Sequence, residues 1–269
     1  MALTATEISV IVNSALSRIA AGSISEASQS DVKGVEANRH YEQTRDSLLR
    51  SYLWPFAKKR AELTQIQIIT LDSAPSPNLW EPGDVITGGT SGTTATILVR
   101  LSDTEYEIGY LDGEFEDGED IQNETVDTAT GASGYPELEV LQPTFRWAFA
   151  YQMPTDLLRL LTVHEDDGID YEDSRWEIEG NRILTNYSTC NIVYIRKVTD
   201  PVEFDVLFTE VLILRLAMKL INPLAGTASD QFKAELREEL RIAEGRARTV
   251  TAQETNTTGR SNWNLARFK

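Results

Sequence analysis

Residues 47–63 read SLLRSYLWPFAKKRAEL, and a helical pattern changes to a strand-like one within this stretch. Up to Trp54 the apolar residues recur with helical spacing, and Pro55 then disfavours helical geometry at the residue before it. The cations Lys58, Lys59 and Arg60 follow directly. Three interpretations are open: a nucleic-acid patch, a targeting signal, or a joint between two structural elements.

The composition of the chain favours the joint. Its 269 residues carry a net charge of −17, whereas proteins that bind duplex DNA usually present clustered cations. Only Arg45 and Arg50 add positive charge nearby, and Lys58–Arg60 are expected to complement the negative end of the helix. The residues of the predicted helix-to-sheet joint are Tyr52, Trp54, Pro55 and Phe56.

Two amphipathic helices are expected before the joint. Residues 4–21 place their apolar side chains on one face, with Gly22 as the C-terminal cap. A second helix is expected over residues 30–54, where Ser30 or Asp31 offers a side-chain oxygen as the N-terminal cap.

Two further helices are expected near the C-terminus. Asp200 caps the first, Pro201 occupies its first helical position, and Pro223 ends it. The second spans residues 228–251, and its apolar residues recur at spacings of four and three, which indicates packing against one neighbouring helix.

Strand patterns lie between these helical regions. Alternating or continuous apolar runs rich in β-branched residues predict short strands, and Gly-Asn is a preferred hairpin turn. The expected strands are residues 60–70, 146–154, 157–165, a hairpin over 176–186 around Gly180 and Asn181, and 190–198. The fold class is therefore α+β, a bundle of about four helices with a small antiparallel β-sheet.

An acidic insertion interrupts this pattern. Residues 81–124 hold twelve Asp and Glu against one Arg, and they are rich in Gly and Thr. We interpret residues 70–141 as an inserted small β-barrel-like module. The remaining boundaries are a core formed by residues 1–69 and 142–252, and an extended C-terminal arm over 253–269.

No catalytic, cofactor or metal site is expected. His40 and His164 fall in different predicted elements, and the lone Cys190 leaves no zinc-type cluster. GGTSGTT at residues 88–94 lacks the lysine and the following helix of a phosphate loop. DGEFEDGED at residues 112–120 lacks the spacing of an EF-hand, although weak cation binding stays open. The chain is therefore not expected to be an enzyme.

The N-terminus and the cysteine usage bear on the compartment. The first residues carry no basic region and no long apolar run, so neither a signal peptide nor a transmembrane helix is expected. A single cysteine excludes an intrachain disulfide, which suits a reducing cytoplasm or a particle assembled there.

Three segments occur in one order: WPFAKKRA from Trp54, YQMPTDLLR from Tyr151, and YIRKVTDP from Tyr194. With the helical regions around them they resemble the tail tubular protein A family. Its members are the head-to-tail adaptor, or connector, proteins of short-tailed bacteriophages. The resemblance covers residues 1–68 and 142–252, and the chain departs from the family pattern in the acidic insertion.

The resemblance implies a virion protein, assembled in the bacterial cytoplasm, that forms a ring, usually of twelve copies, beneath the portal. The helices would form a collar, the C-terminal arm would reach the portal, and the opposite face would receive a tail nozzle like tail tubular protein B. Genome DNA would pass through without specific binding, and no membrane partner is implied. The arm residues expected to dock are Arg260, Trp263, Leu265, Arg267, Phe268 and Lys269.

Other functions remain open from the sequence. The inserted module could decorate the ring or dock tail fibres or the nozzle. The chain could also be another neck or head-completion protein of the virion. A third alternative is a glycan-binding or hydrolytic virion protein that uses the inserted module.

Overall fold

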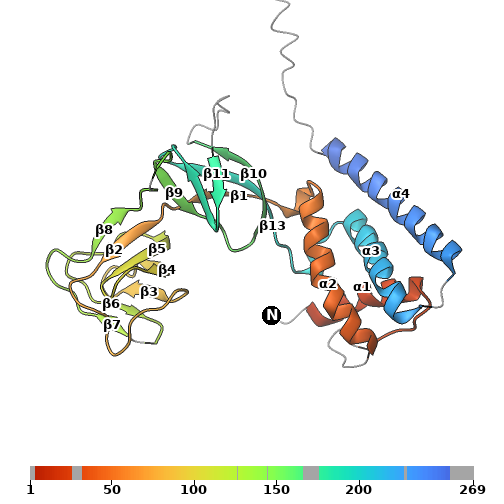
Figure 1. The fold of residues 1–269 in the computed structure, drawn as a ribbon, viewed down its shortest axis with the longest axis horizontal. Coiled ribbons are helices and arrows are strands. Elements are labelled where there is room, and N and C mark those ends of the chain that lie inside the picture. The colour runs from red at the N-terminus through yellow and green to blue at the C-terminus, as the bar shows by residue number, and fades with distance from the viewer. Residues whose placement is uncertain are drawn as a thin grey trace, which may run out of the picture. The chain divides into compact units, whose positions relative to one another are not determined.

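A computed structural model describes residues 4–25, 32–125, 127–143, 145–165, 176–226 and 229–254. Within these residues the chain is mixed α+β, with four α-helices and three antiparallel sheets (Figure 1). It divides into two compact units. Unit 1 comprises Met1–Lys59, Asp156–Arg159 and Tyr194–Lys269, and unit 2 comprises Arg60–Thr155 and Leu160–Val193.

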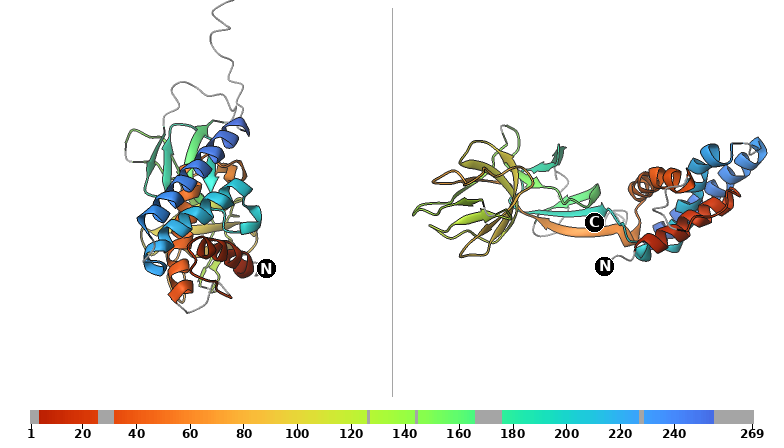
Figure 2. Two further views of the ribbon diagram at one scale, coloured as in Figure 1. Left: turned by 90° about the vertical axis from the view of Figure 1, so that its right-hand side faces the viewer. Right: turned by 90° about the horizontal axis from the view of Figure 1, so that it is seen from below.

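Unit 1 contains the helices. They are α1 (Thr4–Arg18), α2 (Val32–Ser51), α3 (Val206–Leu224) and α4 (Asp230–Glu254). The other three helices all pack against α3 (Figure 2). Helix α3 is the most apolar of the four, and its fully buried residues include Phe208, Leu212, Leu216 and Leu220. Because each buried leucine contributes about 1.5–3 kcal/mol, α3 supplies much of the stability of this unit.

Both ends of α3 differ from the prediction. The N-terminal cap is Asp205, whose carboxylate accepts hydrogen bonds from the amides of Leu207 and Phe208 at 2.7 and 3.3 Å. Asp200 and Pro201 instead open a separate 3₁₀ turn, Pro201–Glu203. The helix also continues through Pro223 to Leu224, because the ring lies in the last turn and removes only one helical hydrogen bond.

Helix α2 ends at Ser51, three residues before the predicted end at Trp54. Trp54 is extended, with φ −68° and ψ 118°, as expected for a residue that precedes proline. The predicted caps Ser30 and Asp31 lie outside the described residues.

The C-terminal end of α1 is a Schellman turn centred on Ala20. The amide of Ala21 donates to the carbonyl of Leu16 at 3.0 Å, and the amide of Ala20 donates to Ser17 at 3.2 Å. This turn needs a left-handed residue, and Ala20 supplies it with φ 54°. The predicted cap Gly22 is therefore wrong, since it follows the turn, although its own φ is also positive.

Replacing Ala20 by glycine should stabilise the chain by about 0.5–1 kcal/mol. Glycine avoids the left-handed penalty of a Cβ, and that gain exceeds its larger entropy loss on folding. Ala20 is exposed, so its methyl group loses little packing. Urea unfolding measures the change. Ala21→Gly is the matched control and should destabilise, because Ala21 has no positive φ.

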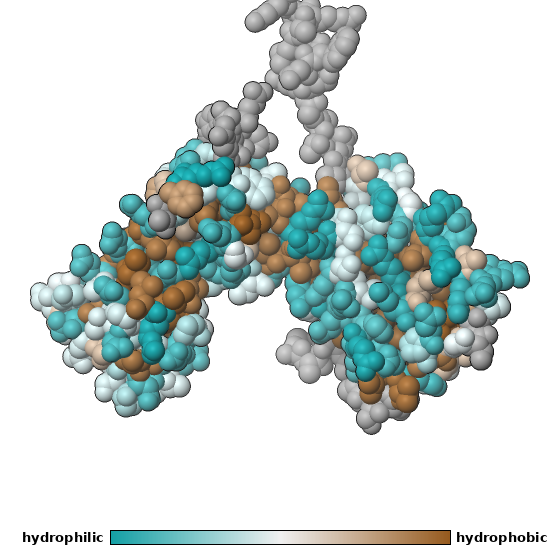
Figure 3. Space-filling view, viewed as in Figure 1, coloured by the Kyte–Doolittle hydropathy of each residue, from teal (hydrophilic) through white to brown (hydrophobic). Residues whose placement is uncertain are grey.

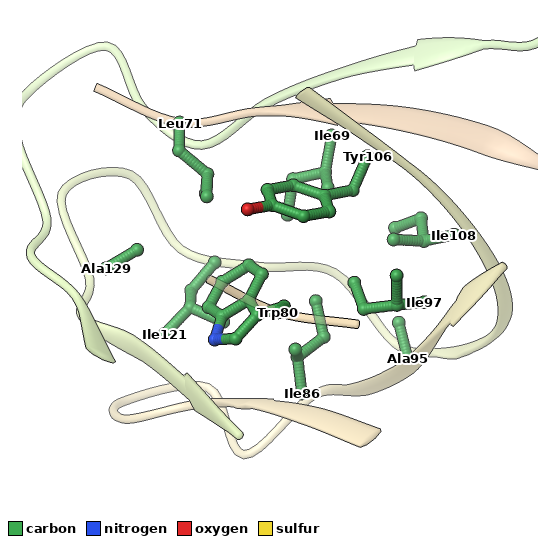
Figure 4. Close-up of a cluster of buried hydrophobic side chains, with 10 residues drawn as sticks. All are labelled: Ile69, Leu71, Trp80, Ile86, Ala95, Ile97, Tyr106, Ile108, Ile121 and Ala129. Carbon is green, nitrogen blue, oxygen red and sulfur yellow. The ribbon is translucent and has the colours of Figure 1, made fainter. Parts of the chain in front are cut away.

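Unit 2 contains a curled seven-stranded half-barrel, with strand order β7-β6-β3-β4-β5-β2-β8. Its strands are β2 (Gln67–Thr70), β3 (Val85–Gly88), β4 (Thr94–Arg100), β5 (Glu105–Asp112), β6 (Ile121–Asn123), β7 (Thr128–Ala129) and β8 (Glu137–Val140). Trp80 and Tyr106 fill the centre of its core, with ring centroids 5.3 Å apart (Figure 4). The indole Nε1 of Trp80 donates to the carbonyl of Asp127 at 2.9 Å, so its buried N–H is satisfied.

Two three-stranded sheets complete the β-structure. One has the order β11-β12-β9, formed by Trp176–Glu179, Arg182–Thr185 and Phe149–Gln152. The other has the order β1-β13-β10, formed by Lys58–Leu63, Cys190–Arg196 and Leu157–His164, and the boundary between the units falls within these strands. The β-content therefore exceeds the small sheet that was predicted.

The expected strand over residues 60–70 is two strands, β1 and β2, in different sheets. Between them the amide of Ile66 donates to Ala150 at 2.9 Å, and its carbonyl accepts from Leu141 at the same distance. These long-range pairings break the strand. The hairpin around Gly180 and Asn181 is confirmed, because Glu179 pairs with Arg182 across a two-residue turn.

Candidate functional site

The joint predicted from residues 47–63 is a cluster of buried and partly buried aromatic rings in unit 1. Trp54 is 1% exposed, and its Nε1 donates to the carbonyl of Leu48 at 3.0 Å. Its ring meets Phe208 of α3 edge-on at 5.1 Å and Tyr52 at 5.6 Å. Phe56, in the 3₁₀ turn that Pro55 opens, lies 5.2 Å from Phe208. Such edge-on pairs stabilise beyond their buried area.

Two guanidinium groups, from α3 and α4, contact Tyr52. Arg248 of α4 lies 4.7 Å from the ring centroid and donates to the phenolic oxygen at 2.7 Å. Arg215 of α3 donates to the same oxygen at 3.4 Å and pairs with Glu244 at 2.7 Å. The joint therefore ties the end of α2 to both α3 and α4.

The three cations after the joint do not complement the helix end as predicted. They lie in β1, and Lys59 pairs with Asp156 at 3.0 Å. Asp156 also accepts from the hydroxyl of Tyr194 at 2.8 Å. Burial alone would raise the pKa of Asp156, but the hydrogen bonds from Lys59 and Tyr194 outweigh it and lower that pKa. Lys58 is exposed.

Trp54→Ala should lower the free energy of unfolding by about 3–5 kcal/mol, because the whole indole is removed from a closely packed site. Lys58→Ala is the control and should change it by less than about 0.5 kcal/mol. Urea denaturation followed by circular dichroism measures both. A tryptophan variant as stable as the parent chain would contradict the buried joint.

The loop that resembled a phosphate-binding loop already holds an anion, the side chain of Glu119. Its carboxylate accepts the amides of Thr90 and Ser91 at 2.9 Å each, the hydroxyl of Ser91 at 2.8 Å and the amide of Glu116 at 2.7 Å. Glu119 is only 5% exposed. The amide donors of residues 88–94 are therefore used within the fold.

Other carboxylates of the insertion serve backbone amides in the same way. Asp117 accepts from the amide of Gly134 at 2.6 Å, and Asp120 accepts from that of Gly131 at 2.6 Å. Asp127 is buried and accepts hydrogen bonds from Thr125 at 2.7 Å and from the side chain and amide of Asn78 at 3.0 and 3.1 Å. The acidic composition thus has a structural use in closing turns.

The stability of unit 2 should fall in acid because of these carboxylates. Burial raises the pKa of Glu119, but the amide and hydroxyl donors outweigh it, so the folded pKa lies below the usual 4.5. The Thr125 hydroxyl, chief among several donors, lowers the pKa of Asp127 below 3.8. A lowered folded pKa adds stability above the unfolded pKa, and this stability disappears as the pH falls through the folded value.

Glu119→Gln should therefore destabilise the chain by about 1–3 kcal/mol near neutral pH and flatten the decline of stability below about pH 4.5. Urea unfolding from about pH 7 to about pH 3, followed by tryptophan fluorescence, measures both effects. Glu116→Gln is the control, since the Glu116 side chain is exposed. Parallel pH profiles for Glu119→Gln and the parent chain would refute this role.

The titratable residues considered in the sequence do not converge on a reactive centre. His40 lies 3.8 Å from Glu36 on α2, and His164 Nε2 lies 2.8 Å from the Thr162 hydroxyl. Cys190 is fully buried, and burial raises its pKa to about 12, which keeps the thiol protonated. No cluster of three His, Cys, Asp or Glu suited to a metal ion occurs among the residues that the structure describes.

The predicted docking residues of the arm lie outside the described residues, namely Arg260, Trp263, Leu265, Arg267, Phe268 and Lys269. The description ends with α4 at Glu254. Next to the last turn of α4 is a pocket of about 250 Å³, lined by Tyr52, Leu53, Arg159, Arg248 and Thr251 among others. The last described turn of the chain therefore lies beside the aromatic joint.

The net charge is divided unequally between the two units. Unit 2 contains 25 Asp and Glu against 5 Lys and Arg, whereas unit 1 contains 17 against 20. Figure 3 shows patches of hydrophobic residues between hydrophilic ones over the half-barrel. In the described parts of the chain no helix is long and apolar enough to span a bilayer.

A scan against protein-family models finds no match to the chain, and a search of characterised proteins finds no similar sequence.

Proposed function

We propose that this chain is the head-to-tail adaptor of a short-tailed bacteriophage. Copies of it, twelve by the family resemblance, would form a ring that joins the portal to a nozzle like tail tubular protein B. The ring would surround the channel through which the genome leaves. The role is structural and requires neither a cofactor nor a catalytic residue.

One observation carries this proposal. The three segments that resemble the adaptor family are far apart in sequence, and each contributes one member of a single network. Lys59 comes from WPFAKKRA, Asp156 from YQMPTDLLR and Tyr194 from YIRKVTDP. Lys59 Nζ lies 3.0 Å from the Asp156 carboxylate and 5.9 Å from the centroid of the Tyr194 ring, and Tyr194 donates to Asp156 at 2.8 Å. Motifs that meet in space are more informative than motifs that merely share an order.

The charge distribution also supports passage of DNA without adhesion. A share of the carboxylates of unit 2 would line the channel, where they repel the phosphate backbone. Unit 1, with 20 cations against 17 carboxylates, would be free to form protein contacts. The acidic insertion would then serve as a docking surface for the nozzle or for tail fibres. A ring reconstruction with a basic lumen would contradict this arrangement.

The C-terminal arm is proposed to attach the ring to the portal. Residues 255–269 carry three cations and no Asp or Glu, and aromatic and arginine residues are frequent hot spots at protein interfaces. Deleting residues 257–269 should therefore abolish portal docking and leave the fold intact.

Negative-stain electron microscopy of the chain with and without a portal protein tests this proposal. We expect rings to form on the portal with the full chain and not with the deletion variant. A variant in which residues 257–269 are scrambled keeps length and charge and should also fail. Circular dichroism checks that the helices are retained. Portal rings decorated equally by the deletion variant would rule the proposal out, and glycan binding or hydrolysis retained by that variant would favour the third alternative.

A further inference from the structure

Helices α2 and α4 border a groove within unit 1, and α3 forms its floor. Both helices pack mainly against α3 and little against each other. A pocket of about 360 Å³ lies between the three helices, lined by Thr44 and Ser47 of α2, Met218 of α3 and Leu240 of α4 among others. The described part of the bundle thus leaves a gap between α2 and α4, which we call the α2–α4 groove.

The pocket of about 250 Å³ beside the last turn of α4 continues this groove. Arg215 borders the first pocket and donates to the hydroxyl of Tyr52, which borders the second. Along α4 the lining extends from Leu240 to Thr251, which is about 16 Å at a helical rise of 1.5 Å per residue. Leu53 is 43% exposed at the far end, so the second pocket also offers apolar surface.

The charged side chains that line the two pockets include four cations. Lys219 and Arg215 lie at the first pocket, and Arg159 and Arg248 lie at the second. Arg215 pairs with Glu244 at 2.7 Å. Arg159 and Arg248 donate only to the carbonyl of Arg50 and to the Tyr52 hydroxyl, and neither they nor Lys219 form an ion pair with another described residue. Three positive charges along the groove are therefore available to a partner.

These cations decide which partner the groove admits. Exposed arginine and lysine stems commonly cover apolar helix surface, and that is their ordinary structural role. Their charges also attract an acidic segment and repel a basic one. Residues 255–269, which follow α4 in the chain, carry three cations and no Asp or Glu, so charge disfavours them as the occupant.

We propose that the α2–α4 groove binds an acidic amphipathic helix of a partner protein. A helix laid between α2 and α4 would repeat the packing that both already make with α3. Its apolar residues, two to three turns apart, would enter the two pockets, as in other helix-in-groove complexes. Its carboxylates would pair with Lys219, Arg159 and Arg248. This inference concerns unit 1 alone and does not require that the chain be a phage adaptor.

Binding of a fluorescein-labelled model peptide to the full chain, measured by fluorescence anisotropy, tests the proposal. The peptide is a helix of about 18 residues with leucine at i, i+4, i+7 and i+11 and with glutamate and alanine on its other faces. We expect a Kd below about 1 mM, and no binding of the same peptide with lysine in place of glutamate. Absence of binding of the acidic peptide at about 1 mM, or equal binding of the lysine peptide, would overturn the proposal.

Charge reversal in the protein gives a second readout. Lys219→Glu with Arg159→Glu should weaken the acidic peptide ~10-fold or more and allow the lysine peptide to bind. Both residues are exposed, so circular dichroism should show an unchanged fold. Lys58→Glu with Arg246→Glu is the matched control, because it makes the same change in net charge at exposed residues that are not among those lining the groove. Equal weakening by the two double variants would reduce the effect to net charge and refute the groove.

A steric variant locates the binding site. Ala252 lines the second pocket and is exposed, so Ala252→Trp should fill the pocket and weaken the acidic peptide ~10-fold. Gln253→Trp adds the same side chain at the next exposed residue and should leave the Kd nearly unchanged. In nuclear magnetic resonance spectra the amide signals of Leu240 and Ala252 should shift as the peptide is added. Shifts of the same signals when the chain alone is concentrated would identify a second copy as the occupant and would contradict the proposal.

Discussion

The buried indole of Trp54 is the contact on which the organisation of unit 1 depends. It closes the end of α2, packs against Phe208 of α3, and lies beside Tyr52, which Arg215 and Arg248 hold from α3 and α4. The chain enters β1 directly after this cluster. The aromatic cluster therefore connects α2, α3 and α4, and the buried N–H of Trp54 donates to the carbonyl of Leu48, six residues earlier in α2. The helix cannot continue into β1 at this point, since Pro55 disfavours a helical conformation at Trp54.

Unit 2 depends on a different physical principle, the use of carboxylates as internal anions. Its small core around Trp80 and Tyr106 is surrounded by long turns, and their amides need acceptors. Glu119, Asp117, Asp120 and Asp127 supply these acceptors. The residues that contribute to the acidity of the module therefore also shape it.

Adaptor function is inferred from the meeting of Lys59, Asp156 and Tyr194 in one network. The charge of the chain is divided between a slightly cationic helical unit and a strongly anionic β-unit.

The sequence by itself determined the features that arise from contacts between near neighbours. Periodicity located the four helices, proline ended α2 near Trp54, and Gly180-Asn181 specified the hairpin, because each signal acts over a few residues. Only the tertiary structure decided what depends on distant partners. The backbone of Ile66 forms hydrogen bonds with Ala150 and Leu141, and these bonds divide an apparently continuous strand. Lys59 forms an ion pair with Asp156 and not with a helix end. The carboxylate of Glu119 likewise binds the amides of the glycine-rich loop at residues 88–94. Ala20 adopts a left-handed conformation that glycine would adopt more easily. No local pattern encodes these choices, since the free energy that decides them comes from side chains and backbone groups far apart in the chain.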